Sequence, residues 1–241
     1  MSGTKTDKIR RHYDKVADTY DHHYDHHRGK KYHTHLSNHL VKVLPEGGNL
    51  LDIGCGTGLF VEKYIRNGGS GTGIDISEGM VAKARRRCPE CEFLVGTGEQ
   101  LPFEDNSFNA VSSVLVFSYV KDPAAMLSEV FRVLEPNGSV ALCTLGKKLI
   151  TRGIPRLYKL GEKIKVKHVV MKDFGEHYYD EMEMNTLFHD AGFSNINVKW
   201  CSFAHIDMID PIFSLATKVE PFVEKSLPQL AYNIFVSAKK V

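Results

Sequence analysis

A turn with three closely spaced glycines is the feature that most constrains the fold of this chain. An apolar stretch at 49–53 runs into the pattern G-x-G-x-G at 54–58, and a helical periodicity begins at Leu59. A second apolar stretch then ends in Asp75. This strand–turn–helix–strand layout binds adenosine-containing cofactors at the carboxyl edge of a parallel sheet. A dinucleotide fingerprint needs its third glycine where this chain has Leu59, so the spacing argues against a dinucleotide.

The rest of the chain repeats the alternation of strand and helix patterns. Strands are predicted at 49–53, 71–75, 91–95, 109–115, 139–144, 195–203 and 231–239, and helices at 9–20, 30–43, 59–68, 77–87, 122–134, 180–191 and from 210. Such alternation is typical of an α/β fold, in which a doubly wound parallel sheet is covered by helices on both faces.

Bulk composition narrows the class of protein further. A length of 241 residues with 42% hydrophobic residues suits one α/β domain, and a net charge of +2 gives no reason to expect nucleic acid. No apolar run approaches the roughly 20 residues of a membrane span. The polar stretch 1–11 lacks the apolar region of a signal peptide, and an odd number of cysteines, five, fits a reducing compartment. We therefore expect a cytoplasmic protein with no transmembrane segment.

Several motifs together resemble one enzyme family. The segment LLDIGCGTG at 50–58 resembles motif I of the class I S-adenosylmethionine (SAM)-dependent methyltransferases, and YDKVADTYD at 13–21 resembles their N-terminal YD-x-x-A-x-x-YD segment. GTGEQLPF at 96–103, DNSFN at 105–109 and RVLEPNG at 132–138 resemble further motifs of these enzymes. The similarity covers most of 9–145 and is greatest to the small-molecule branch (type 11-like) that includes ubiquinone, menaquinone and sterol methyltransferases.

The resemblance implies a Rossmann-like, seven-stranded, mostly parallel sheet whose last strand is antiparallel. It also implies SAM as the methyl donor, S-adenosylhomocysteine as the product, and a set of cofactor-binding residues: Tyr13, Tyr20, Asp52, Gly54, Cys55, Gly56, Gly58, Asp75, Ile76, Met80, Thr97, Gly98, Glu99 and Leu115.

Physical reasons support the central members of this set. Glycines at 54–58 lack Cβ atoms, so the backbone can approach the methionine tail of SAM closely and adopt positive φ. The Asp75 carboxylate can accept hydrogen bonds from both ribose hydroxyls. Asp52 can orient the loop and, through water, the ammonium group of the tail.

Departures from the family pattern leave the methyl acceptor open. Thr97 replaces the aspartate beside adenine, and its hydroxyl is a weaker acceptor than a carboxylate. The fourth strand ends in VLVF at 114–117 rather than Asn-Pro-Pro-Tyr, which weakens an adenine or glutamine amide as substrate. The signature of the ubiquinone and menaquinone enzymes is missing too. Methyl transfer to a small molecule is the prediction; alternatives are an RNA or protein methyltransferase, or a SAM-binding module without transferase activity.

Two flanking segments are expected to close the site of a single domain spanning 1–241. One is an N-terminal helical lid at 1–45, and the other is a basic lid at about 147–180, whose charge suits an anionic or lipid-like small molecule. The sequence gives no clear catalytic group, because SAM supplies the chemical drive and a base is needed only for some acceptors. The candidates for a base are His177, Tyr178 and Tyr20.

A histidine-rich patch and a C-x-x-C pair remain outside these motifs. Eight of the 12 histidines lie in one short N-terminal stretch: His12, His22, His23, His26, His27, His33, His35 and His39. The pairs 22/26 and 23/27 have a spacing that can hold a metal, yet cysteines are missing nearby and methyl transfer needs no metal, so no metal is expected. The C-x-x-C at 88–91 has no second pair and is expected to be an ordinary loop.

Overall fold

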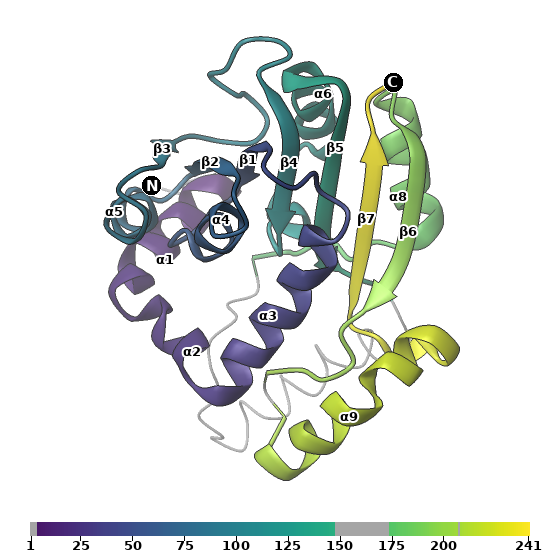
Figure 1. The fold of residues 1–241 in the computed structure, drawn as a ribbon. Coiled ribbons are helices and arrows are strands. Elements are labelled where there is room, and N and C mark those ends of the chain that lie inside the picture. The colour runs from purple at the N-terminus through teal and green to yellow at the C-terminus, as the bar shows by residue number, and fades with distance from the viewer. Residues whose placement is uncertain (1–3, 148–173, 207) are drawn as a thin grey trace.

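A computed structural model describes residues 4–147, 174–206 and 208–241. Seventeen elements are assigned in these ranges (Figure 1): α1 (Lys5–Tyr20), α2 (His22–Asp25), α3 (His27–Val41), β1 (Asn49–Ile53), α4 (Leu59–Ile65), β2 (Ser70–Asp75), α5 (Glu78–Arg87), β3 (Glu92–Val95), β4 (Phe108–Val114), η1 (Phe117–Tyr119), α6 (Pro123–Val133), β5 (Leu134–Leu145), α8 (Glu181–Asp190), β6 (Ser194–Cys201), α9 (Asp210–Ser226), η2 (Pro228–Leu230) and β7 (Asn233–Lys239). Within those ranges, no helix has the length and apolar character needed to cross a bilayer.

The strands form one seven-stranded sheet in the order β3-β2-β1-β4-β5-β7-β6. The first five strands pair in parallel, whereas β7 is antiparallel to both β5 and β6. The predicted α/β class and mostly parallel seven-stranded sheet are therefore confirmed.

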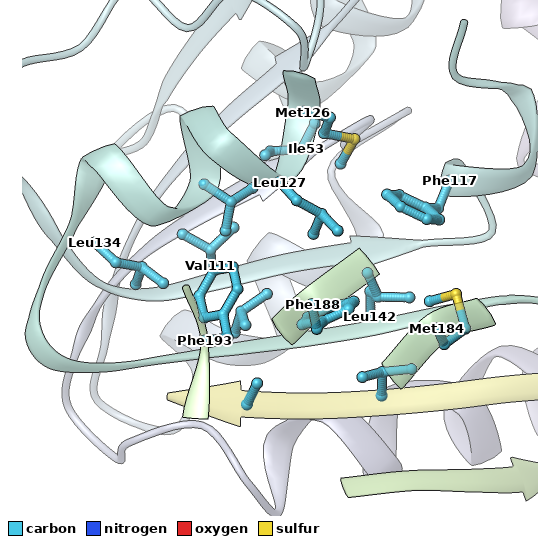
Figure 2. Packing of buried hydrophobic residues seen from close by; sticks show 14 of the residues in the cluster. Ile53, Val111, Phe117, Met126, Leu127, Leu134, Leu142, Met184, Phe188 and Phe193 are labelled. Atoms are coloured by element: carbon cyan, nitrogen blue, oxygen red, sulfur yellow. The ribbon is translucent and has the colours of Figure 1, made fainter. Parts of the chain in front are cut away.

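Successive side chains of the central strands point to opposite faces of the sheet, where they belong to two separate hydrophobic cores. Leu51 of β1 and Val111 of β4 point to one face, where the helices α6 and α8 cover them with Leu127 and Phe188 (Figure 2). On the other face, Leu50 belongs to a cluster that α3 and α4 complete. Each of the central strands is apolar on both sides because helices cover both.

Local capping explains why several helices begin where the sequence predicted. The side chains of Ser77, Asp122 and Asp180 each accept a hydrogen bond from a backbone N–H in the first turn of α5, α6 and α8. Thr4 and Asp7 form a reciprocal capping box at the start of α1.

Several boundaries differ from the sequence predictions, among them the start of α1 at Lys5 rather than near residue 9, and two further starts have a clear physical cause. Helix α3 starts at His27 rather than near residue 30, because the His26 ring accepts the N–H of Gly29 and caps an additional turn. Strand β5 starts at Leu134 rather than at 139. The expected turn at 136–138 is an irregularity inside the strand, where the register against β4 shifts and Asn137 has φ +66°.

Candidate cofactor site

The glycine turn lies between β1 and α4, at the edge where the parallel strands end. The N–H groups of Gly54 and Cys55 both donate to the carbonyl of Ile74, which fixes the turn against the last residues of β2. Gly54, Gly56 and Gly58 have φ of +72°, +52° and +82°. All three therefore occupy the left-handed region that disfavours other residues, as the pattern predicted.

The space around the three glycines differs. Close approach of a ligand to the backbone, which the sequence pattern indicated as the reason for all three, can therefore not explain each of them. A Cβ on Gly54 would lie 2.2 Å from a methyl of Val116, and one on Gly58 would lie 3.2 Å from the Ala84 side chain. Only at Gly56 is the nearest atom 4.0 Å away, on the ring of Tyr20. Gly54 and Gly58 thus allow close packing within the protein, while Gly56 alone presents bare backbone toward open space.

Asp75 ends β2 and holds the turn from the opposite side. One carboxylate oxygen accepts the N–H of Gly56 at 2.9 Å, and the other accepts the N–H of Ser77 at 2.9 Å. Burial raises the pKa of Asp75 above its ordinary value, although these two N–H groups act in the other direction. Each oxygen retains acceptor capacity beyond its one backbone bond.

Asp52 is buried in the sheet, where its side chain faces the neighbouring strand β4. Its carboxyl is buried and accepts the hydroxyl of Ser112 on β4 at 2.7 Å. Burial raises its pKa to about 7, against an ordinary value of 3.8; the Ser112 bond offsets part of this, and the nearby Asp75 charge adds to it. A contact of Asp52 with a ligand ammonium group stays a prediction.

Two of the three aspartates in this region attach α1 and the residue after it to the cofactor edge. Asp14 accepts the Ser77 hydroxyl at 2.7 Å and the Gly79 N–H at 3.1 Å, at the start of α5. Asp21 accepts the hydroxyl of Thr57 in the glycine turn at 2.6 Å and pairs with Arg87 at 2.6 Å. The third, Asp18, makes an exposed ion pair with α5. The N-terminal helix is thereby attached to the turn itself.

Four tyrosines meet at this edge of the sheet, and two of them, Tyr13 and Tyr20, lie within electrostatic reach of Asp75. The rings of Tyr13 and Tyr20 are 6.1 Å apart, and those of Tyr20 and Tyr24 are 5.5 Å apart. The Tyr13 and Tyr119 side chains interact with each other, as do those of Tyr20 and Tyr24. Burial raises the pKa of all four hydroxyls, so each is neutral near pH 7.

Tyr24 and Tyr119 were missed in the sequence. Tyr24 lies four residues after Tyr20, a spacing that could have signalled it. Tyr119 follows a strand end that resembles no family motif.

The segment 96–103, which resembles the family motif beside adenine, is held by α6 and by the residues just before it. Glu99 accepts the N–H of Lys121 at 3.1 Å. Arg132 donates to the carbonyls of Leu101 and Phe103, and its ion pair with Glu129 holds it in place. The predicted residues Thr97 and Gly98 are half-buried at the start of this segment.

The remaining predicted cofactor residues lie around the same edge. Leu115 directly follows β4 with φ +60°, an unusual value for leucine, and its N–H donates to Cys143. Met80 is buried in the first turn of α5, and Ile76 is half-buried before it. Cys55 is buried, and burial raises the pKa of its thiol, which disfavours the thiolate that a nucleophilic role would need.

The two candidate bases after the basic segment lie in an extended stretch at 174–179. The N–H of His177 donates to the carbonyl of Ser118, which places this stretch beside η1. The His177 ring, however, is half-exposed and pairs with Glu183 at 2.6 Å. Tyr178 is half-buried. Of the basic lid expected at about 147–180, residues 148–173 lie outside the described residues.

The C-x-x-C pair adds no redox or metal motif. All five cysteines are free thiols, and Cys88 is buried at the end of α5. Burial raises the pKa of Cys88 and of Cys91, which suits inert packing groups.

Comparison with known proteins defines the class. The methyltransferase domain family matches residues 51–142. The demethylmenaquinone methyltransferase of Tropheryma whipplei is 31% identical over 172 residues, which cover 66% of this chain and 72% of that protein. The chain therefore belongs to the SAM-dependent methyltransferases and is an enzyme of that class, as the motifs predicted.

Solved structures agree in fold. A possible histamine N-methyltransferase from Thermotoga maritima, described as SAM-dependent, matches with a TM-score of 0.69 at 22% identity, covering 97% of this chain and 100% of that one. A phosphoethanolamine N-methyltransferase from Haemonchus contortus, in complex with S-adenosylhomocysteine, has a TM-score of 0.70 at 17% identity and covers 99% of this chain and 60% of that one. Family membership implies that this chain uses SAM.

The buried Asp52 carboxyl predicts a pH dependence of stability. Its pKa is raised by folding, so its contribution to stability is complete below about pH 3.8 and is lost as the pH rises through about 7. Between pH 5 and pH 8 this loss amounts to about 2–3 kcal/mol. Asp52→Asn keeps an acceptor for Ser112 but cannot ionise. In urea unfolding, the free energy of unfolding of the wild type should therefore fall more steeply between pH 5 and pH 8 than that of the variant. Equal pH dependence in the two proteins would contradict the raised pKa of Asp52.

Proposed function

We propose that this enzyme transfers the methyl group of SAM to a small-molecule acceptor in a pocket beside Asp75. The observation that carries the proposal is the combination of one carboxylate, one bare glycine and four tyrosines at the carboxyl edge of the sheet. A parallel sheet opens to its ligands at this edge.

The residues at the edge fit the parts of SAM. Asp75 would accept the ribose hydroxyls with the lone pairs that Gly56 and Ser77 leave free. The open side of Gly56 admits the methionine tail, because a side chain there would enter the same space. Neutral tyrosine rings such as those of Tyr13 and Tyr20 attract a cation to their faces, which suits the sulfonium.

The adenine is assigned to the other side of Asp75. Gly96 donates its N–H to the carbonyl of Asp75, so the segment with Thr97, Gly98 and Glu99 begins directly beside the ribose position. Leu115 follows the neighbouring strand β4 and offers an apolar contact. The Arg132 bonds keep this segment rigid, which reduces the ordering cost of binding.

The chain's contribution to the reaction is positioning and exclusion of water. SAM, when bound, supplies an activated methyl group that an acceptor atom attacks in line. The protein must hold donor and acceptor in contact, and the tyrosines of the N-terminal helix shield the site from solvent. Tyr20 is neutral near pH 7, so it serves as a hydrogen-bond donor rather than as a base. His177 pairs outward with Glu183, which leaves Tyr178 as the stronger candidate of that segment.

The acceptor is proposed to be a small molecule, and an anionic or lipid-like one is favoured. The name of the Tropheryma whipplei relative supports a small-molecule acceptor, and the basic stretch around 147–172 supports negative charge or a lipid surface. An RNA or protein substrate would need an extended basic face, for which the net charge of +2 gives no support.

A turnover assay tests the proposal. Purified protein and SAM are incubated with three acceptor pools, namely lipid quinols, phosphorylated small amines and fatty acyl thioesters, and S-adenosylhomocysteine is quantified. We expect acceptor-dependent product from one pool. Binding of SAM without turnover on any of them, but with turnover on RNA or protein extract, would overturn the small-molecule assignment.

Removing the Asp75 carboxylate should weaken the cofactor site. A hydrogen bond to a charged group contributes about 1.5–3 kcal/mol, so Asp75→Ala should reduce SAM affinity at least about tenfold by calorimetry. Glu99→Ala serves as a comparison at the adenine side, and melting temperature shows that both variants are folded. Unchanged affinity in a folded Asp75→Ala protein would contradict the ribose assignment.

The attachment of the N-terminal helix should control how well the cofactor is retained. Asp21→Ala removes the bonds to Thr57 and Arg87, so the helix should open more often and S-adenosylhomocysteine should dissociate faster by several fold. Asp18→Ala is the matched control, because it removes only the exposed pair with Lys83. Hydrogen exchange at 13–20 should slow on ligand binding in the wild type and in the control. Equal dissociation rates in both variants would show that this helix does not act as a lid.

A further inference from the structure

A second cluster of chemically active side chains lies away from the cofactor site, between α3 and α9 (Figure 1). His35 and His39 are one turn apart on α3, and Glu220 and Glu224 are one turn apart on α9. These four side chains come from opposite ends of the chain, and they meet face to face.

Two of the three distances in the cluster are close to those around a four-coordinate ion. The Nε2 atoms of His35 and His39 are 3.4 Å apart, and His39 Nε2 lies 3.5 Å from Glu224 Oε2. An ion with ligand bonds of about 2.0–2.1 Å in tetrahedral geometry separates its ligand atoms by about 3.3–3.4 Å. His35 Nε2 is 2.7 Å from Glu224 Oε1, close enough that a small rotation of the carboxylate suffices.

The candidate ligands also have outer hydrogen-bonding partners of the kind that surround metal ligands. His35 Nδ1 lies 3.6 Å from Glu220 Oε2, so the other ring nitrogen faces a carboxylate, as in many histidine metal sites. Glu220 is itself fixed, since its other oxygen accepts the N–H groups of Phe203 and Ala204. Glu224 accepts the N–H of Ser202 at 2.8 Å.

Charge supports a cation at this place. The Glu220 and Glu224 side chains are only 6% and 16% exposed, and two buried carboxylates need compensation. Two neutral imidazoles and a dication neutralise the pair completely. The ring of His39 also packs against Phe235, which holds it in the cluster and limits access of water.

We propose that His35, His39 and Glu224 bind one divalent transition-metal ion of the zinc class, with Glu220 orienting His35. The ion fastens α9 and the segment 202–206 to α3 and takes no part in methyl transfer. This site differs from the pairs 22/26 and 23/27, whose spacing first raised the question. His26 is instead used to cap α3. The expectation that no metal binds rested on the lack of nearby cysteines and on the chemistry of methyl transfer, and neither reason excludes a structural ion held by histidine and carboxylate ligands.

Titration of the full chain, freed of metal by a chelator, tests the site. Zn²⁺ should bind with a stoichiometry of one in competition with a chromophoric chelator, and it should raise the melting temperature. Glu220→Gln should weaken binding about 10–100-fold, as loss of an outer carboxylate does elsewhere. His39→Gln and Glu224→Gln remove ligands and should weaken it further. Glutamine retains polar atoms that can bond to the neighbouring groups, which favours folding of these variants.

His27→Gln is the matched control, because His27 is an exposed histidine of the same helix. It should bind Zn²⁺ as the wild type does. No binding at a stoichiometry of one, or equal affinity in the control and the two ligand variants, would overturn the proposal. SAM affinity measured alongside distinguishes this result from a failure of the cofactor site, because the metal-free protein should still bind SAM.

Discussion

The contact between Asp75 and the glycine turn is the interaction on which the rest of the site depends. The carboxylate at the end of β2 holds the N–H of Gly56, which follows β1, and the N–H of Ser77, which caps α5. One side chain thus fixes the relative positions of two strand ends and one helix start. Gly56 forms this bond in a backbone conformation with positive φ, so the arrangement needs both a glycine at position 56 and an acidic residue at position 75.

The N-terminal helix adds a second set of contacts at this edge of the sheet. Its aspartates bind the same elements that Asp75 organises, namely the glycine turn through Thr57 and the start of α5 through Ser77. Helix α1 therefore lies against the cofactor edge, although it is not part of the sheet. The buried tyrosine hydroxyls stay neutral, so the edge combines one carboxylate with aromatic faces and uncharged hydroxyls.

The sequence predicted the sheet well because its determinants are local. Strand β1 has the predicted bounds, and Ser77 and Asp122 cap the predicted helices, because apolar runs and caps act within a few residues. The start of β5 was missed, since the irregularity at 136–138 depends on pairing with β4.

The sequence motifs singled out residues that gather at one edge of the sheet, but they did not give all the packing reasons for them, and the contacts of these residues with a cofactor stay predictions. That Gly54 packs on Val116 depends on a contact between two strand ends, and no periodicity reports such a contact. The facing of His35 and Glu224 joins residues far apart in the chain, so only the structure brings them together. His35 and His39 have the same four-residue spacing as the pairs 22/26 and 23/27, so spacing alone could not single them out.

A crystal structure of the chain with S-adenosylhomocysteine tests the central claim most directly. Both ribose hydroxyls should lie within hydrogen-bond distance of the Asp75 carboxylate, with the amino-acid tail against the open side of Gly56. A ligand bound elsewhere, with Asp75 bonded only to Gly56 and Ser77, would show that this edge is not the cofactor site.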